Sequence, residues 1–213
     1  KNMRVRSARN WTNEINKSIM SFRKEKFMSL AGITAVEHPV EELKSISRNL
    51  LNDGIHGICF SAYDEGQQPG DQLTEAQVRR KLSILKPYIS WVRTFSCTEG
   101  NEFIAQIAHE MGIKTLVGAW LGDDLEKNEA EIAGLIALCK EGVVDVAAVG
   151  NEVLYREDLE ASALVKYIER VKAEVSGVPV GYVDAYYEFT DHPEVSDVCD
   201  VILANCYPYW EGC

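Results

Sequence analysis

Several signatures of common protein classes are missing from this 213-residue sequence. No stretch approaches the roughly 18 apolar residues of a membrane span, and no hydrophobic segment typical of a signal peptide is visible. Basic residues are in the minority, with 22 Lys and Arg against 33 Asp and Glu, for a net charge of −11. Because binding to a phosphate backbone requires a basic surface, this balance argues against nucleic acid as the main partner.

The sequence also lacks the motifs that would identify a cofactor or a nucleophilic serine. Neither GxGxxG nor GxxxxGK[ST] follows the first predicted strand, and GxSxG is absent. The histidines are scattered, and no two of them form the i, i+4 pair that binds zinc together with an acidic partner; they are His38, His56, His109 and His192. We therefore expect no cofactor and no metal.

The six cysteines form no CxxC pair and match no zinc-binding spacing. Most lie in or beside apolar runs, which is typical of free thiols in a reducing compartment and favours a cytoplasmic location. Cys97 is a candidate nucleophile, with the alternative that it is a small loop residue. The six are Cys59, Cys97, Cys139, Cys199, Cys206 and Cys213.

Residues 1–37 are predicted to form a basic N-terminal extension. Residues 1–30 carry eight Lys and Arg against two Glu. Apolar residues recur there at helical spacing, which indicates an amphipathic helix. Such a helix can lie on a membrane or a partner, but packing against the acidic remainder of the chain is the favoured alternative.

From residue 38 onward, strand and helix patterns alternate, so residues 38–213 are interpreted as one catalytic domain. Each predicted strand is followed by a predicted helix, which indicates a parallel sheet with right-handed crossovers. Strands are expected at 55–60, 91–95, 114–120, 143–149, 178–183 and 201–205. Helices are expected at 39–52, 74–86, 101–111, 127–141, 158–175 and 193–198.

Two parallel architectures fit this order, a doubly wound open sheet and a (β/α)8 barrel. An open sheet gathers its site at one switch point, whereas a barrel collects residues from all strand ends onto one face. Polar and aromatic residues follow nearly every predicted strand, so the sequence favours a (β/α)8 TIM barrel, here with about six βα units.

The segment Gly150-Asn151-Glu152 follows a short apolar run that reads as a buried strand. An acid at the carboxyl end of such a strand lies where parallel α/β proteins carry out chemistry. Asn151 could bind a substrate hydroxyl. The alternative is that Glu152 merely begins the next helix, where a negative charge is favourable.

The aromatic residues at strand ends suit a sugar ligand, because sugar rings stack on aromatic faces while polar groups bind their hydroxyls. Any single aromatic residue is more often part of a core, but several at strand ends favour binding. The candidate platforms are Trp120, Tyr186, Tyr209 and Trp210.

Four segments together resemble family 17 glycoside hydrolases, the β-1,3-glucanase type with TIM barrels, and the bacterial branch in particular. The resemblance covers about residues 54–213. The segments are Gly57 to Tyr63 (GICFSAY), Trp91 to Phe95 (WVRTF), Val149 to Val153 (VGNEV) and Asn205 to Trp210 (NCYPYW).

The resemblance implies a retaining glycoside hydrolase acting on β-1,3-glucan. It implies that Glu152 is the acid/base and that Asn151 binds the sugar 2-hydroxyl. Residues implied to line the subsite at the scissile bond are Tyr63, Arg93 and Tyr207. Further substrate-binding candidates, chosen by strand-end position, are Trp120, Asp184, Tyr186, Tyr209 and Trp210. Family members are often exported.

One part of the family pattern is missing. A retaining mechanism needs a second carboxylate about 5–5.5 Å from the first, and the family carries it after the seventh strand in a Glu-x-Gly-Trp-Pro motif that this sequence lacks. Asp184 and Glu211 are conceivable but disfavoured substitutes. We expect a fragment of a longer enzyme, a barrel whose open edges are covered by self-association or a further C-terminal segment, or a truncated inactive form.

Three functions therefore remain open: a retaining hydrolase with its nucleophile beyond residue 213, a truncated barrel that binds carbohydrate without cleaving it, and a glucan transglycosylase. Water and sugar acceptors compete for the same intermediate, so the sequence does not distinguish the first from the third.

Overall fold

The computed structural model describes residues 38–207. The predicted basic extension, together with Tyr209, Trp210 and Glu211, lies outside the described residues. Asn49–Asn205 form one compact unit, and this unit contains the sheet. No helix between residues 38 and 207 is long and apolar enough to cross a membrane.

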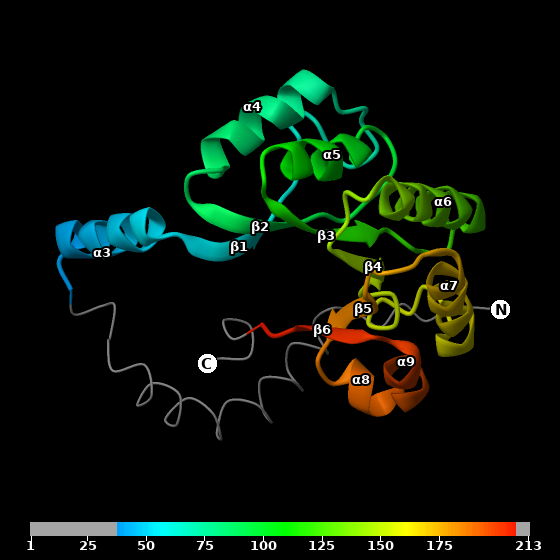
Figure 1. Cartoon of the computed structure of the whole chain (residues 1–213). Helices are drawn as coiled ribbons and strands as arrows, with labels where there is room; N and C mark the ends of the chain where they lie inside the picture. The colour runs from blue at the N-terminus through cyan, green and yellow to red at the C-terminus, as the bar shows by residue number, and fades with distance from the viewer. Residues whose placement is uncertain (1–37, 208–213) are drawn as a thin grey trace. The chain divides into compact units, whose positions relative to one another are not determined.

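The sheet has six parallel strands in the order β1-β2-β3-β4-β5-β6. Sequential strands are therefore neighbours, as in a barrel, and helices α4 to α9 lie along one face of the curled sheet (Figure 1). The predicted incomplete (β/α)8 barrel is confirmed. The strands are β1 (Ile55–Cys59), β2 (Ile89–Arg93), β3 (Lys114–Ala119), β4 (Val146–Asn151), β5 (Val180–Ala185) and β6 (Val201–Asn205).

Helix α3 precedes β1, and the other helices connect successive strands, as right-handed crossovers require. They are α3 (Val40–Asp53), α4 (Glu75–Leu85), α5 (Glu102–Glu110), α6 (Leu125–Glu141), α7 (Ala161–Glu174), α8 (Glu188–Asp191) and α9 (Pro193–Val198).

Capping residues and a glycine fix the ends of two of the helices. The Thr74 side chain accepts a hydrogen bond from the Gln77 N–H at 3.3 Å and caps α4. Asp124 caps α6 by accepting from two backbone N–H groups at 3.1 Å each. Gly142 ends α6 at φ +79°, a left-handed conformation that glycine adopts without steric cost.

The core fills the space between the sheet and its helices in two clusters. One packs α6 and α7 against β3, β4 and β5, and its members include Ile132, Leu164 and Val149 at 0% exposure. The other packs α4 and α5 against β1 and β2 around Leu82 and Val92. Alternate strand residues therefore face the helices, which leaves the intervening ones on the opposite, barrel-interior face.

Some boundaries of strands and helices differ from those predicted from the sequence. β2 begins and ends two residues earlier than predicted, β4 extends to Asn151, and α8 was not predicted. Helix α3 carries apolar residues, but none of its residues is buried, and Leu50 is 58% exposed.

Candidate active site

The end of β4 contains an irregularity that determines where Asn151 points. Ala148 pairs with Gly181 and Asn151 pairs with Val183, so β4 has one residue more than β5 over this interval. Strict alternation would place Asn151 on the helix-facing side with Val149, whereas a bulge reverses the face. Gly150 permits it at φ +90°, and Asn151 consequently faces the barrel interior.

A hydrogen-bonded network joins the ends of β2, β4 and β6. Arg93 donates from one guanidinium nitrogen to the Asn151 side-chain oxygen and from the other to Asn205 Oδ1 at 3.3 Å. Asn205 Nδ2 in turn donates to Glu152 Oε1 at 2.8 Å. Three predicted site residues, Arg93, Asn151 and Glu152, are thus brought together, with Asn205 linking the acid to the arginine.

The backbone at Glu152 is held in an uncommon conformation. Its φ is +53°, in the left-handed region that side-chain-bearing residues rarely occupy. Its N–H donates to the Val183 carbonyl at 2.8 Å, and its carbonyl accepts from the Arg156 N–H at 3.0 Å. Such conformations persist where the surrounding structure fixes them, and they occur often at active sites.

Two arginines connect the aromatic residues of the site to Asn151. The Arg93 guanidinium lies 4.7 Å from the centre of the Phe95 ring, and that of Arg156 lies 4.5 Å from the Trp120 ring. Arg156 also donates to the Asn151 main-chain carbonyl and to the Leu121 carbonyl. The two arginines thereby fix the positions of both rings relative to the end of β4.

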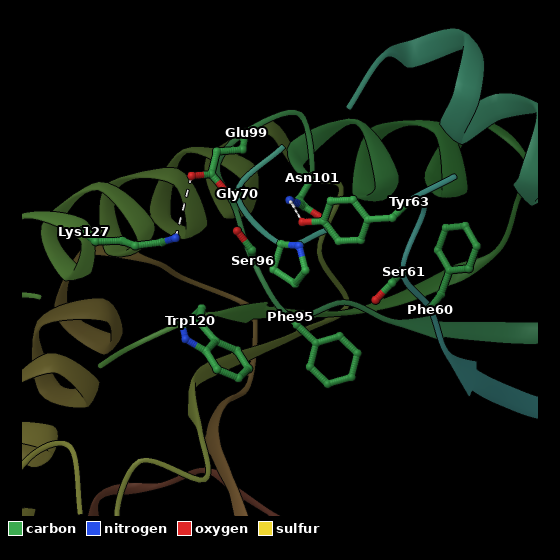
Figure 2. A pocket seen from close by; sticks show the side chains of 11 residues that line it. Phe60, Ser61, Tyr63, Gly70, Phe95, Ser96, Glu99, Asn101, Trp120 and Lys127 are labelled. Carbon is green, nitrogen blue, oxygen red and sulfur yellow. Dashed lines mark hydrogen bonds and ion pairs between the residues drawn. The ribbon is translucent and has the colours of Figure 1, made fainter. Parts of the chain in front are cut away.

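A cavity of about 240 Å³ opens beside these aromatic residues. Trp120 and Phe95 form part of its wall, and Figure 2 shows their rings on one side of Ser96 and the Glu99–Lys127 pair on the other. Glu99 and Lys127 are 3.7 Å apart. The cavity is lined by Phe60, Ser61, Tyr63, Pro69, Gly70, Phe95, Ser96, Glu99, Asn101, Trp120 and Lys127.

The other predicted binding residues occupy different positions. Tyr63 lines the cavity, and its hydroxyl accepts from Asn101 Nδ2 at 3.4 Å. Tyr186 follows β5, is 38% exposed, and makes an edge-to-face contact with Tyr187 at 5.3 Å between ring centres. Tyr207 is exposed and follows β6.

Asp184 does not face the barrel interior. It is 0% exposed and lies on the helix-facing side of β5 together with Tyr182. Its carboxylate accepts hydrogen bonds from the Tyr182 hydroxyl and from the N–H groups of Leu154 and Tyr155 at 3.2 and 3.3 Å. Asp184 therefore fixes the segment after Glu152, and we do not retain it as a sugar ligand or as a second carboxylate. Burial raises its pKa.

Cys97 is also unsuited to catalysis. Its side chain is 4% exposed, and burial, assisted by the nearby Glu131 charge, raises the pKa of the thiol well above its usual value. The alternative interpretation of Cys97 as a small residue packed in the loop after β2 fits this environment.

Sequence reasoning gave no role to Asn205, Arg156, Glu131 or Phe95. Asn205 could have been found, because it ends the sixth predicted strand within a recognised motif. Arg156 and Glu131 lie inside segments that read as ordinary helix or turn, and their roles depend on contacts with Leu121 and with the loop after β2. No local pattern reports such contacts.

Comparison with known proteins gives a consistent result. A family model described as the BtgE/BtgC glycoside hydrolase domain matches residues 57–213. A glucan 1,3-beta-glucosidase of Saccharomyces cerevisiae is 30% identical over 199 residues, which cover 84% of this chain and 59% of the relative. One of Schizosaccharomyces pombe is 28% identical over 194 residues, with the same two coverages.

Solved structures agree with the sequence relatives. The glycoside hydrolase family 17 beta-1,3-glucanosyltransferase of Rhizomucor miehei is 29% identical with a TM-score of 0.64, covering 76% of this chain and 60% of that one. An active-site mutant of that enzyme in complex with laminaritriose gives the same values. The chain spans about 59% of the length of the two yeast glucosidases described above. The chain belongs to the BtgE/BtgC glycoside hydrolase domain family and is related to family 17 glycoside hydrolases.

Proposed function

We propose that this chain carries the acid/base half of a retaining glycoside hydrolase that acts on β-1,3-glucan. The observation that supports this most directly is the network linking Glu152, Asn205, Arg93 and Asn151 at the carboxyl ends of three parallel strands. Chemistry in (β/α)8 barrels is located at this face. The glucan 1,3-beta-glucosidases among the relatives support β-1,3-glucan as the substrate class.

In this proposal, Glu152 protonates the glycosidic oxygen in the first step and deprotonates water in the second. Asn205 donates to Glu152 Oε1 and so helps to orient the carboxyl group. Asn151, fixed by Arg93, binds the 2-hydroxyl of the sugar being cleaved.

The second carboxylate, the nucleophile, is proposed to lie outside the described residues. Asp184 is excluded as a substitute because it is fully buried on the helix-facing side of β5. The relatives are longer than this chain, and their remaining length can supply the missing strand ends.

The cavity beside Trp120 and Phe95 is proposed to hold one sugar unit adjacent to the scissile bond. Stacking of the ring on these aromatic faces provides apolar contact area. Lys127, Glu99 and Asn101, on the cavity wall, offer donors and acceptors for the hydroxyls.

Transglycosylation is the second candidate, for a specific reason. Three tyrosines that follow the ends of β4 and β5 are 45%, 38% and 38% exposed, namely Tyr155, Tyr186 and Tyr187. An acceptor sugar stacked there would compete with water for the intermediate. The structural neighbour from Rhizomucor miehei is a glucanosyltransferase.

The experiment compares the full-length protein with its Glu152→Gln variant on laminarin, measuring released reducing sugar. We expect the variant to lose about 10²–10⁴-fold in kcat, and full activity of the variant would contradict the proposal. Calorimetry with laminari-oligosaccharides distinguishes the binding alternative, since heat without product would support it. Formation of products longer than the donor oligosaccharide, at high donor concentration, would identify a transglycosylase.

A further inference from the structure

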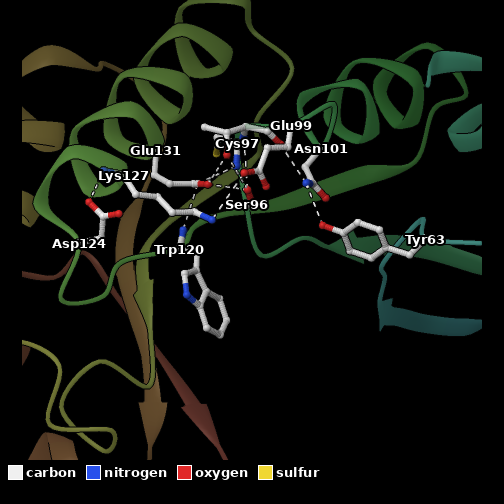
Figure 3. A network of polar contacts seen from close by, with 10 residues as sticks. Tyr63, Ser96, Cys97, Glu99, Asn101, Trp120, Asp124, Lys127 and Glu131 are labelled. Carbon is white, nitrogen blue, oxygen red and sulfur yellow. Dashed lines mark hydrogen bonds and ion pairs between the residues drawn. The ribbon is translucent and has the colours of Figure 1, made fainter. Parts of the chain in front are cut away.

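Glu131, in the middle of α6, is a buried carboxylate at 0% exposure on which four hydrogen bonds converge. Oε1 accepts from the Ser96 hydroxyl at 2.5 Å and from the Thr98 hydroxyl at 2.7 Å. Oε2 accepts from the Cys97 N–H at 2.8 Å and from the Trp120 N–H at 3.1 Å. Figure 3 shows this arrangement, with donors from two segments meeting one side chain.

The donors come from two different strand ends. Ser96, Cys97 and Thr98 follow β2, whereas Trp120 follows β3. Ser96 and Trp120 both line the cavity beside the acid network. One side chain on a helix therefore sets the spacing between two walls of the proposed sugar site.

Helix α6, which carries Glu131, is itself held close to the two strand ends. Asn128, one turn before Glu131, accepts from the Gly122 N–H and donates to the Gly122 carbonyl, both at 2.8 Å. Gly134, in the next turn, lets the helix approach closely, since a Cβ there would lie 2.6 Å from the Cys97 carbonyl oxygen. Sites held by side chains from a rigid element keep their geometry better than loops alone.

A buried carboxylate is an unusual choice if the position served only to fill the core. Removing a charge from water is costly unless hydrogen bonds compensate for it, and an apolar residue would fill the space without that cost. The four hydrogen bonds that compensate for the burial of Glu131 all come from the segments after β2 and β3. The same bonds therefore join these two strand ends.

We propose that Glu131 is a positioning residue that holds Trp120 and the loop after β2 at the spacing required to bind a glucan chain. The proposal rests on the proposed function, because it explains how the sugar site is shaped. Glu131 does not reach the reacting atoms, and its influence is exerted through Trp120 and Ser96.

The test compares Glu131→Ala with Glu131→Gln in the full-length protein. A glutamine oxygen can accept from the two N–H groups, while its NH₂ donates to the two hydroxyls after they rotate. We expect the Gln variant to keep a KM for laminari-oligosaccharides within about threefold of wild type. We expect the Ala variant to raise this KM about tenfold or more, with kcat changed much less.

A role in stability alone would lower the melting temperature of the Ala variant and leave its KM unchanged, and that result would overturn the proposal. If the Ala variant does not fold, Thr98→Val replaces it, because this change removes one donor to Glu131 at a residue that does not line the cavity. It should raise KM in the same direction, and an unchanged KM would again contradict the proposal.

A second readout does not depend on sugar. Trp120 fluorescence is measured with every other tryptophan of the protein replaced by Phe, Trp11, Trp91 and Trp210 among them, and quenching by acrylamide should increase in the Ala variant and not in the Gln variant. Equal quenching in both would overturn the positioning role. If wild-type protein neither binds nor cleaves glucan, the proposed function fails. The quenching measurement still tests whether Glu131 holds Trp120 in position.

Discussion

At the scale of single residues, Asn151 connects the acid to the aromatic walls of the site. Arg93 binds its side chain and Arg156 binds its main-chain carbonyl, and each arginine also covers an aromatic ring. The orientation of Asn151 therefore depends on two cations that are themselves held by stacking. This predicts that substitutions at the arginines act on catalysis as well as on packing.

Replacing Arg93 with Ala removes the donors to both Asn151 and Asn205. With the asparagines no longer oriented, we expect kcat/KM on laminari-oligosaccharides to fall about 10²–10³-fold. Steady-state kinetics measure the effect. Arg79→Ala is the matched control, because Arg79 pairs on the surface of α4 with Glu75 and Glu110 and should leave the kinetics unchanged.

The cysteines give a prediction that is independent of sugar. Burial raises the pKa of Cys139 and of Cys199 to about 11, so both thiols stay protonated at pH 8. The stability linked to these two protons is fully present below the ordinary thiol pKa of about 9, and it is lost as the pH rises from about 9 to about 11. Exposed Cys59 should react with a maleimide at pH 8 at least about 100-fold faster than Cys139.

Peptide mapping by mass spectrometry reads out this labelling. Rapid modification of Cys97 in the folded protein would contradict its burial and would restore it as a candidate nucleophile.

At the scale of secondary-structure elements, the bulge in β4 brings Asn151 into the site. A Cβ at Gly150 would lie 2.8 Å from Val153 Cγ2 and 3.3 Å from a Tyr182 ring carbon, and the residue is at φ +90°. Gly150→Ala should therefore reduce the free energy of unfolding by about 1–3 kcal/mol, as measured by chemical denaturation. Activity should fall further than stability accounts for, since the bulge sets the orientation of Asn151.

Gly142→Ala is the comparison for that variant. Gly142 also has a positive φ, but nothing lies within 4 Å of a Cβ there, and it ends α6 before β4 begins, at the opposite end of that strand from Asn151. We expect a similar backbone cost with unchanged kinetics. Equal kinetic losses in both variants would indicate a general effect of destabilisation.

The elements themselves could largely be predicted from the sequence, because apolar periodicity and cap residues are local signals. Strand β6 and helix α9 have the predicted bounds, and Thr74, a residue type that favours helix caps, caps α4. The bulge could not be predicted, since it depends on the pairing of β4 with β5. The position of Asp184 could not be predicted either. Its place near a strand end suggested a sugar ligand, whereas its side chain lies on the helix-facing side of β5 together with Tyr182.

At the scale of the whole described molecule, pairing is uneven across the sheet. Strands β2, β3, β4 and β5 are paired on both sides, whereas β1 and β6 each pair with one strand within residues 38–207. β5 is buried along its entire length, and β6 alternates between partly buried and exposed residues. Local opening should therefore begin at the two outer strands.

Hydrogen exchange tests this expectation. We predict that amides of β4 and β5 exchange most slowly and those of β1 and β6 most rapidly among the strands, because opening an outer strand breaks fewer hydrogen bonds. Slower exchange in β6 than in β4 in the full-length protein would show that a further strand or another chain covers that edge, as the barrel interpretation allows.

The central claim is that Glu152 is the acid/base of a retaining glycosidase, and azide rescue of Glu152→Ala tests it most directly. In the full-length protein, we expect laminarin hydrolysis to fall about 10³-fold, while an aryl laminarioside with a good leaving group still forms the glycosyl-enzyme. Azide should then restore turnover and give a β-linked glycosyl azide, because it attacks from the face that Glu152 serves. An α-linked azide would identify Glu152 as the nucleophile, and undiminished laminarin hydrolysis would remove it from the mechanism; either result would contradict the account.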